Sequence, residues 1–190
     1  MRKTVILLIA LFLAAVVSEA RVVKGRVTCG RKKLSSVVVT DGRNFTQTSR
    51  RGTFTLEICD SAEFVYIVTP SGYTADWSEG SPAFYRKAAG QSYFEFDLKF
   101  TGKPAGTYNI IAVGDPQPRS KDHFNEFSGV PLDDIRQCVA GLKSPTVAIV
   151  VGDITHDKYY LMNNWKETMK SEPIPFYHHL LFPLVFLYLL

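Results

Sequence analysis

The chain has 190 residues and a formal net charge of +4. This length suits one domain or two small ones. The positive excess is spread along the chain, with Arg31-Lys32-Lys33 as its main cluster, whereas nucleic-acid-binding proteins usually concentrate basic residues on one face. We therefore expect no nucleic-acid partner.

The first 20 residues have the layout of a secretory signal peptide. A basic start precedes an unbroken apolar run over residues 5–17, and Ser18-Glu19-Ala20 places small residues where a signal peptidase reads. A retained membrane anchor is the alternative, but a spanning helix needs about 20 apolar residues. We predict cleavage before Arg21, export to a periplasmic or extracellular location, and no transmembrane span after cleavage.

Residues 21–100 predict a β-sandwich accessory domain. Short β-rich runs alternate apolar and polar residues, and turn signals such as Asp41-Gly42 and Pro70-Ser71-Gly72 separate them. No helical periodicity interrupts these runs, which favours a sandwich. The predicted strands are residues 22–28, 34–40, 43–48, 52–58, 64–68 and 93–100.

Between the last two runs, the irregular segment Tyr73–Gly90 carries Trp77, Phe84 and Tyr85. Aromatic side chains on such a loop can bind a ligand or pack against a neighbouring domain. We favour a third interpretation, in which they cover an open edge of the sandwich.

The three cysteines leave at least one thiol unpaired. Cys29 and Cys59 both fall in the predicted sandwich and can pair in an oxidising compartment. Cys138 falls in a helical segment, where we expect a small buried hydrophobe. Whether Cys29 and Cys59 pair stays open, because a disulfide depends on geometry that the sequence does not fix.

Residues 107–177 have a different pattern, after a proline- and glycine-containing linker over residues 101–106. Continuous apolar runs at Thr107–Val113 and Thr146–Val151 predict strands buried on both faces. The order strand, helix, strand, helix, strand indicates a parallel sheet. The remaining predicted elements are a helix at residues 132–142, a helix that Asp157 caps and that ends near Lys170, and a strand at residues 174–177.

Two carboxylates follow directly on the apolar strands of this second domain. Asp115 and Asp153 should both emerge at the carboxyl edge of one sheet, where open α/β sheets bind ligands. A single Gly-Asp pair is more often a turn or a cap, but two at this spacing are more specific. Neighbouring carboxylates repel, and a divalent cation offsets the repulsion. We therefore predict a metal site for Mg²⁺, Mn²⁺, Fe or Zn²⁺.

The sandwich resembles a known accessory domain. The pattern from Gly25-Arg-Val through Leu34–Gly42 to Gly52-Thr-Phe-Thr-Leu is similar to the carboxypeptidase-regulatory-like sandwich, in the version found in front of exported calcineurin-like phosphoesterases. This resemblance covers residues 22–100. It implies an Ig-like β-sandwich followed by an α/β metallophosphoesterase domain.

The second domain resembles the calcineurin-like metallophosphoesterases themselves. Gly114-Asp-Pro-Gln117 is similar to their Gly-Asp-x-His motif, with glutamine where most members have histidine, and Gly152–Asp157 matches Gly-Asp-x-x-x-Asp. The resemblance implies a two-metal site that hydrolyses a phosphate ester, with Asp115 and Gln117 on the first metal and Asp153 bridging both. A neutral glutamine binds a metal more weakly than imidazole does. Within the second motif we favour a loop role for His156 over metal ligation.

In this family a Gly-Asn-His motif follows the third strand, and two further histidine motifs come later. Here the third strand runs into His178-His179 and an apolar tail ending at Leu190, and the Asn-His motif does not follow. We interpret residues 178–190 as the product of a frameshift or premature stop, and disfavour the two histidines as a ligand pair because nothing follows to orient them. On this interpretation the α/β domain is incomplete, and we expect the chain to be inactive alone.

An alternative function from another class is a non-catalytic exported protein. In that case the sandwich would bind a carbohydrate or another cell-surface partner, and no catalysis would be expected. A second alternative treats the apolar tail as a membrane anchor, although so few residues are too short to span a bilayer.

Overall fold

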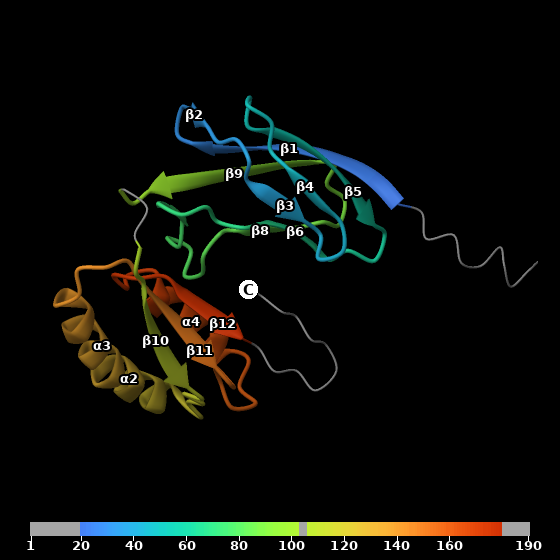
Figure 1. Ribbon diagram of the computed structural model, residues 1–190. Coiled ribbons are helices and arrows are strands. Elements are labelled where there is room, and N and C mark those ends of the chain that lie inside the picture. The colour runs from blue at the N-terminus through green and yellow to red at the C-terminus, as the bar shows by residue number, and fades with distance from the viewer. Residues whose placement is uncertain (1–19, 103–105, 180–190) are drawn as a thin grey trace, which may run out of the picture. The chain divides into compact units, whose positions relative to one another are not determined.

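The structure is a computed structural model that describes residues 20–102 and 106–179, without the side chain of His179 (Figure 1). The described chain separates into two compact units. The first comprises residues 20–68 and 85–96, and the second comprises residues 69–84, 97–102 and 106–179. Within these ranges no helix is long and apolar enough to cross a membrane. The predicted signal peptide lies outside the described residues, except for Ala20.

The first unit is a β-sandwich, as the sequence predicts. One sheet has the strand order β2-β1-β9-β7 with β5 also paired to β1, and the other has the order β4-β3-β6-β8. The carboxyl half of β9 and strand β7 fall in the second unit. The strands are β1 (Ala20–Cys29), β2 (Lys32–Lys33), β3 (Val38–Thr40), β4 (Phe45–Gln47), β5 (Thr53–Cys59), β6 (Phe64–Ile67), β7 (Tyr73–Ala75), β8 (Tyr85–Lys87) and β9 (Tyr93–Phe100).

Strict alternation of side chains builds the core of the sandwich. In β5 every second residue is buried, from Phe54 to Ile58, while the threonines and the glutamate between them are exposed. The predicted strand over residues 34–40 is shorter than expected, because only residues 38–40 pair. Over residues 34–37, hydrogen bonds of the buried Thr48 hydroxyl take the place of strand pairing. This hydroxyl donates to Leu34 O at 2.7 Å and accepts from Val37 N at 2.9 Å.

All three cysteines are free thiols. Strand pairing explains why Cys29 and Cys59 do not meet, since Cys59 lies opposite Ala20 at the first position of β1 and Cys29 is the last residue of that ten-residue strand. Cys138 is exposed, so the expected buried hydrophobe at this position is wrong.

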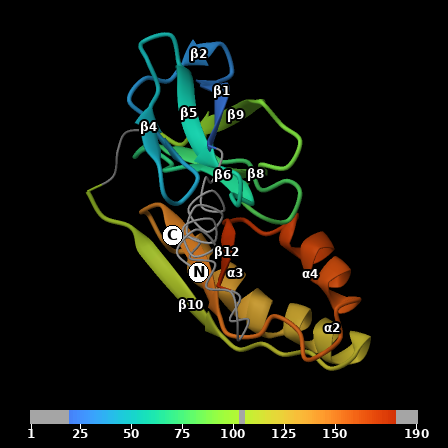
Figure 2. The same cartoon turned by 90° about the vertical axis from the view of Figure 1, so that its right-hand side faces the viewer.

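The second unit contains a parallel three-stranded sheet, which confirms the predicted strand–helix alternation. The strand order is β10-β11-β12, and Figure 2 shows the three helices beside this sheet. The elements are β10 (Asn109–Gly114), α2 (Lys121–Gly129), α3 (Pro131–Ala140), β11 (Thr146–Val151), α4 (Leu161–Met169) and β12 (Phe176–His179).

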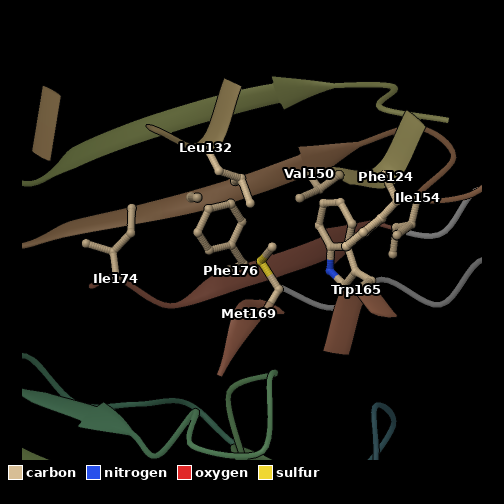
Figure 3. Packing of buried hydrophobic residues seen from close by; sticks show 9 residues of the cluster. Phe124, Leu132, Val150, Ile154, Trp165, Met169, Ile174 and Phe176 are labelled. Atoms are coloured by element: carbon tan, nitrogen blue, oxygen red, sulfur yellow. The ribbon is translucent and has the colours of Figure 1, made fainter. Parts of the chain in front are cut away.

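An apolar cluster joins this sheet to its helices. Trp165 and Met169 of α4 and Phe124 of α2 pack with Val150 and Phe176 from the strands (Figure 3). Ile111 and Val113 of β10 contact the same cluster. The alternate residues Ile110 and Ala112 do not belong to this cluster, and Ile110 is 65% exposed. The expectation that this strand is buried on both faces is therefore wrong, because the helices of the described chain cover one face only.

Part of the second face is covered by the segment that precedes β8. The Phe84 ring lies 5.7 Å from the Tyr177 ring, and Trp77 Nε1 donates to Glu172 O at 3.2 Å. All four residues belong to the second unit. The sandwich-edge interpretation is therefore wrong for Trp77 and Phe84, whereas Tyr85 lies in strand β8 and contacts Phe64 in the first unit.

Helix boundaries differ from the predictions at two places. Helix α2 was not predicted, because Phe124 is its one buried residue and so gives no apolar stripe; its N-cap Ser120 accepts from His123 N. Helix α4 starts at Leu161 with no side-chain cap, and Asp157 instead adopts a positive φ of 38° in the loop, so its predicted capping role is wrong. Strand β12 begins at Phe176, since Pro175 has no N–H to donate.

A buried carboxylate anchors the loop between α4 and β12. The side chain of Glu172 is fully buried and receives two bonds from Arg136 of α3, Nη2 to Oε1 at 2.6 Å and Nε to Oε2 at 3.2 Å. The hydrogen bond to Glu172 raises the pKa of Arg136. The same residue's carbonyl accepts from Trp77. Glu172 therefore ties three segments of the second unit together.

Replacing Arg136 with Met should destabilise the second unit by about 3 kcal/mol, because it leaves a buried carboxylate without a partner. The double variant Arg136→Met/Glu172→Leu should recover most of this loss. Urea unfolding measures both changes. Lys170→Met is the control, since Lys170 pairs with Glu167 and Glu79 on the surface; a loss of stability there equal to that of Arg136→Met would contradict the prediction.

Replacing Gly25 with Ala should destabilise the sandwich by about 1–3 kcal/mol. A β-carbon at this position would overlap the Phe94 carbonyl and the Phe54 ring, and a backbone oxygen has little room to move. Gly106→Ala is the matched control, because no atom lies within 4 Å of its added carbon. The measurement is the midpoint of thermal unfolding. Equal midpoints for the two variants would contradict the prediction, because they would show that the sandwich accommodates the added β-carbon without loss of stability.

Candidate functional site

Strand register brings the two predicted strand-end carboxylates to one level. In the parallel pair β10–β11, Gly114 lies opposite Val151, so both strands end together. The backbone N–H of Asp115 then donates to Val151 O at 2.7 Å. Asp115 and Asp153 therefore leave the same carboxyl edge of the sheet, as the sequence predicts.

The side chains at this edge are hydrogen-bonded to one another. Asp115 Oδ1 accepts from Asp153 N at 2.9 Å, and Gln117 Nε2 donates to Asp153 Oδ2 at 3.1 Å. The backbone N–H of Gln117 donates to Asp153 O at 3.2 Å. The structure thus brings all three predicted metal ligands together.

The backbone of both loops is held in an uncommon conformation. Asp115 has φ 39° and Gln117 has φ 36°, in the left-handed region that non-glycine residues seldom adopt. Gly152 has φ 97°, and a β-carbon there would lie 2.8 Å from Asp115 Oδ1. Residues held this way cost about 1–3 kcal/mol each and cluster at functional sites. The hydrogen bonds between the loops hold them there.

His156 lies on the same loop as Asp153 but turns to other partners. Its backbone N–H donates to Pro118 O at 3.3 Å, which fastens the two loops together. Its Nδ1 atom lies 3.6 Å from Asp157 Oδ2. No contact joins the His156 ring to Asp115 or Asp153 among the described residues, so the favoured loop role remains the better prediction.

The donor set at this edge suits one hard cation. Asp115 and Asp153 are exposed carboxylates, and Gln117 adds an amide oxygen that its Nε2 bond to Asp153 leaves unused. Among the described residues no group of three or more His, Cys, Asp and Glu side chains is placed to hold a metal ion. The glutamine is therefore needed as the third donor, and the three residues together provide too few ligands for two cations.

His178 is a core residue rather than a ligand at this edge. Its ring packs edge-on against Trp165, and its Nε2 accepts from Trp165 Nε1 at 3.3 Å. Its Nδ1 is buried with no partner among the described residues. Burial lowers the pKa of His178 to about 4. This role could not be predicted from the sequence, because it depends on an aromatic side chain from α4.

Comparison with known proteins identifies one relationship. Residues 21–103 match the family model described as the N terminal of calcineurin-like phosphoesterase. This match covers the sandwich and ends before β10. No curated protein and no solved structure matches the chain. The family resemblance is thereby confirmed over its N-terminal domain, and members of the family are generally metal-dependent.

Acid should destabilise the second unit through His178. Its folded-state pKa of about 4 lies below the unfolded value near 6.5, so its contribution to stability is complete above about pH 6.5 and is lost as the pH falls toward 4. Urea midpoints across this window should fall less steeply for His178→Gln, whose amide can still accept from Trp165. The exposed His123→Gln is the control; an unchanged pH slope in His178→Gln would contradict the prediction.

Proposed function

We propose, from the premise that the chain carries the N-terminal domain of a calcineurin-like phosphoesterase, that its second unit belongs to a metal-dependent phosphate ester hydrolase. Asp115, Gln117 and Asp153 would hold the divalent cation at the carboxyl edge of the sheet. The observation that carries this proposal is the hydrogen-bonded junction of two carboxylates from separate parallel strands. Such a pair repels unless a cation neutralises it.

Each carboxylate keeps one oxygen available. Asp115 Oδ1 accepts from Asp153 N and Asp153 Oδ2 accepts from Gln117, which leaves Asp115 Oδ2 and Asp153 Oδ1 without a hydrogen bond among the described residues. The occupied oxygens fix the side chains, and the remaining oxygens can bind. When bound, a divalent cation would neutralise charge on the phosphoryl oxygens and lower the pKa of a water molecule.

Gln117 sets the strength of this site. Its amide oxygen is a less basic donor than an imidazole nitrogen, and the two negative charges of the donor set come from the carboxylates alone. We therefore propose one weak cation site in this chain, whose metal the donor set does not distinguish among Mg²⁺, Mn²⁺, Fe and Zn²⁺. The absence of hydrolysis by the chain alone is part of the same proposal.

Export and a cell-surface partner are proposals that rest on the sequence. The basic start and apolar run over residues 1–20 support export, and these residues precede the sandwich directly. A sandwich in this position can also act as a binding module. Export is tested by expressing residues 1–102 and residues 21–102 in a secreting host. Only the longer fragment, which keeps the predicted signal peptide, should leave the cytoplasm.

Cation binding at the carboxyl edge can be measured directly. Mn²⁺ titration followed by electron paramagnetic resonance should give a dissociation constant that rises at least about tenfold in Asp153→Asn and in Asp115→Asn, since each loses an anionic ligand but keeps an oxygen acceptor for the fold. Gln117→His should bind Mn²⁺ and Zn²⁺ more tightly than the natural chain. Asp157→Asn is the control, an exposed acid on the same loop.

Wild-type affinity in both strand-end variants would overturn the cation site. Hydrolysis of p-nitrophenyl phosphate, measured on the same samples, tests the catalytic proposal separately. Turnover by the natural chain that Asp153→Asn abolishes would show that this unit is active by itself, whereas cation binding without turnover is the expected result.

A further inference from the structure

A cavity lies at the amino edge of the parallel sheet, opposite the edge that carries Asp115 and Asp153. It has a volume of ≈ 750 Å³, and every residue that lines it belongs to the second unit. Its walls include Tyr108, Thr146 and Pro175, which precede or begin the three strands β10, β11 and β12. The cavity is therefore at the amino ends of the strands, whereas Asp115 and Asp153 lie at the carboxyl ends.

Four aromatic side chains line this cavity, Tyr73, Trp77, Tyr108 and Tyr177. The polar ends of two of them are already used inside the protein. Trp77 Nε1 donates to Glu172 O at 3.2 Å, and the Tyr108 hydroxyl lies 2.7 Å from Ser71 Oγ. These bonds fix the Trp77 and Tyr108 side chains, and ring contacts hold the other two: Tyr73 packs against Phe100 at 5.4 Å and Tyr177 against Phe84 at 5.7 Å between ring centroids.

The polar lining consists of hydroxyl groups and one cation. Lys143 is the sole charged residue among the lining residues, it is exposed, and no acidic partner binds it within the described chain. Hydroxyls can donate and accept, which suits a ligand with several hydroxyls of its own. The hydroxyl residues of the lining are Thr69, Ser71, Thr74, Thr101, Ser144 and Thr146. Four of them, Ser71, Thr74, Ser144 and Thr146, already make at least one hydrogen bond within the protein.

The walls are also rigid, which lowers the entropy cost of binding. Four prolines line the cavity: Pro70, Pro145, Pro173 and Pro175. Two of them extend the strand pairing, because Pro145 O accepts from Asn109 N at 2.9 Å and Pro175 O accepts from Ala148 N at 3.0 Å. The sheet thus holds this part of the cavity in place.

We propose that this cavity binds a saccharide that carries a phosphate or carboxylate group. The volume falls within the range of about 300–1,000 Å³ that is usual for ligand pockets. A sugar ring has an apolar C–H face that can lie on an aromatic ring, hydroxyls that match the hydroxyl lining, and an anionic substituent that can pair with Lys143. Aromatic faces, hydroxyls and a single cation without any acid fit this class of ligand.

A proline-rich peptide is the competing ligand for an aromatic groove. Such a peptide presents backbone carbonyls that need donors beside the rings. Here Trp77 Nε1 is bound to Glu172, and the Tyr108 hydroxyl is engaged with Ser71. The indole and phenol donors of these two rings are therefore already used, whereas the Lys143 ammonium offers an anion partner that a neutral polyproline peptide lacks, which favours the anionic saccharide.

The saccharide site is independent of the proposed cation site. Strand β10 has 6 residues between the two edges, and at about 3.3 Å per residue this places them roughly 20 Å apart. A ligand in the cavity would therefore not reach Asp115 or Asp153. Binding in the presence of EDTA, and in the Asp153→Asn variant, distinguishes the two sites.

The fluorescence of Trp77 gives a direct readout of the cavity. The chain has two tryptophans, and Trp165 is buried in the core of the second unit. In the full chain with EDTA present, titration with glucose 6-phosphate, mannose 6-phosphate and galacturonic acid should change tryptophan emission for at least one of the three. Neutral glucose and inorganic phosphate should each bind at least about tenfold more weakly, the equivalent of ~1.4 kcal/mol.

Two variants assign the binding to this cavity. Lys143→Gln should weaken the anionic sugar about tenfold and leave glucose unaffected, whereas Tyr108→Ser should weaken both. Lys166→Gln is the matched control, an exposed lysine of α4 that does not line the cavity. Circular dichroism of each variant verifies the fold.

The proposal is overturned if none of the three anionic sugars changes the emission or saturation-transfer NMR signals. It is also overturned if Lys143→Gln and Lys166→Gln bind alike, or if inorganic phosphate binds as tightly as the sugar phosphates. Binding of a decaproline peptide in preference to the sugars would assign the cavity to peptide recognition instead.

Discussion

The in-register parallel pairing of β10 and β11 is the constraint on which the carboxylate edge depends. Because Gly114 lies opposite Val151, neither strand can extend past the other, and the backbone must turn at the same level on both. The Asp115 carboxylate then accepts the N–H of Asp153, a donor that the ended ladder no longer serves. Asp115 thus has a structural role that does not depend on a ligand, because its side chain accepts a backbone hydrogen bond beyond the end of the β10–β11 pairing.

This pairing also explains the different character of the two sheet edges. At the carboxyl ends, the loops bend through left-handed conformations at Asp115, Gln117 and Gly152 and bring side chains close together. At the amino ends, prolines precede β11 and β12 and hold the chain extended. The first arrangement concentrates charge at a point, and the second lines a wider cavity with rings and hydroxyls.

Features that depend on local sequence were predicted well. Strands β9 and β11 match their predicted bounds, because alternation in one and a continuous β-branched run in the other are visible within a few residues. Asp115 and Asp153 were found by the same means, since a carboxylate after a strand needs no knowledge of distant segments. The carboxypeptidase-regulatory-like pattern of the sandwich is local as well.

Features that depend on contacts with residues elsewhere in the chain were not predicted. A continuous apolar run predicts a buried strand but does not say which faces have neighbours, and so Ile110 was expected inside. The roles of Trp77 and His178 depend on Glu172 and Trp165, which are distant in sequence. Cys29 and Cys59 were left open for the same reason, and the register of β1 with β5 decides the matter.

Gln117 helps to hold the Asp153 carboxylate in place when no cation is bound. An amide can donate to a carboxylate, and Gln117 Nε2 does so at Asp153 Oδ2. Hydrogen bonds to charged groups contribute about 1.5–3 kcal/mol in folded proteins, so this bond offsets part of the repulsion between the two carboxylates. In the cation site proposed above, the glutamine would therefore lower affinity by replacing a basic ligand, while its bond to Asp153 Oδ2 would orient the carboxylate whose Oδ1 remains to bind.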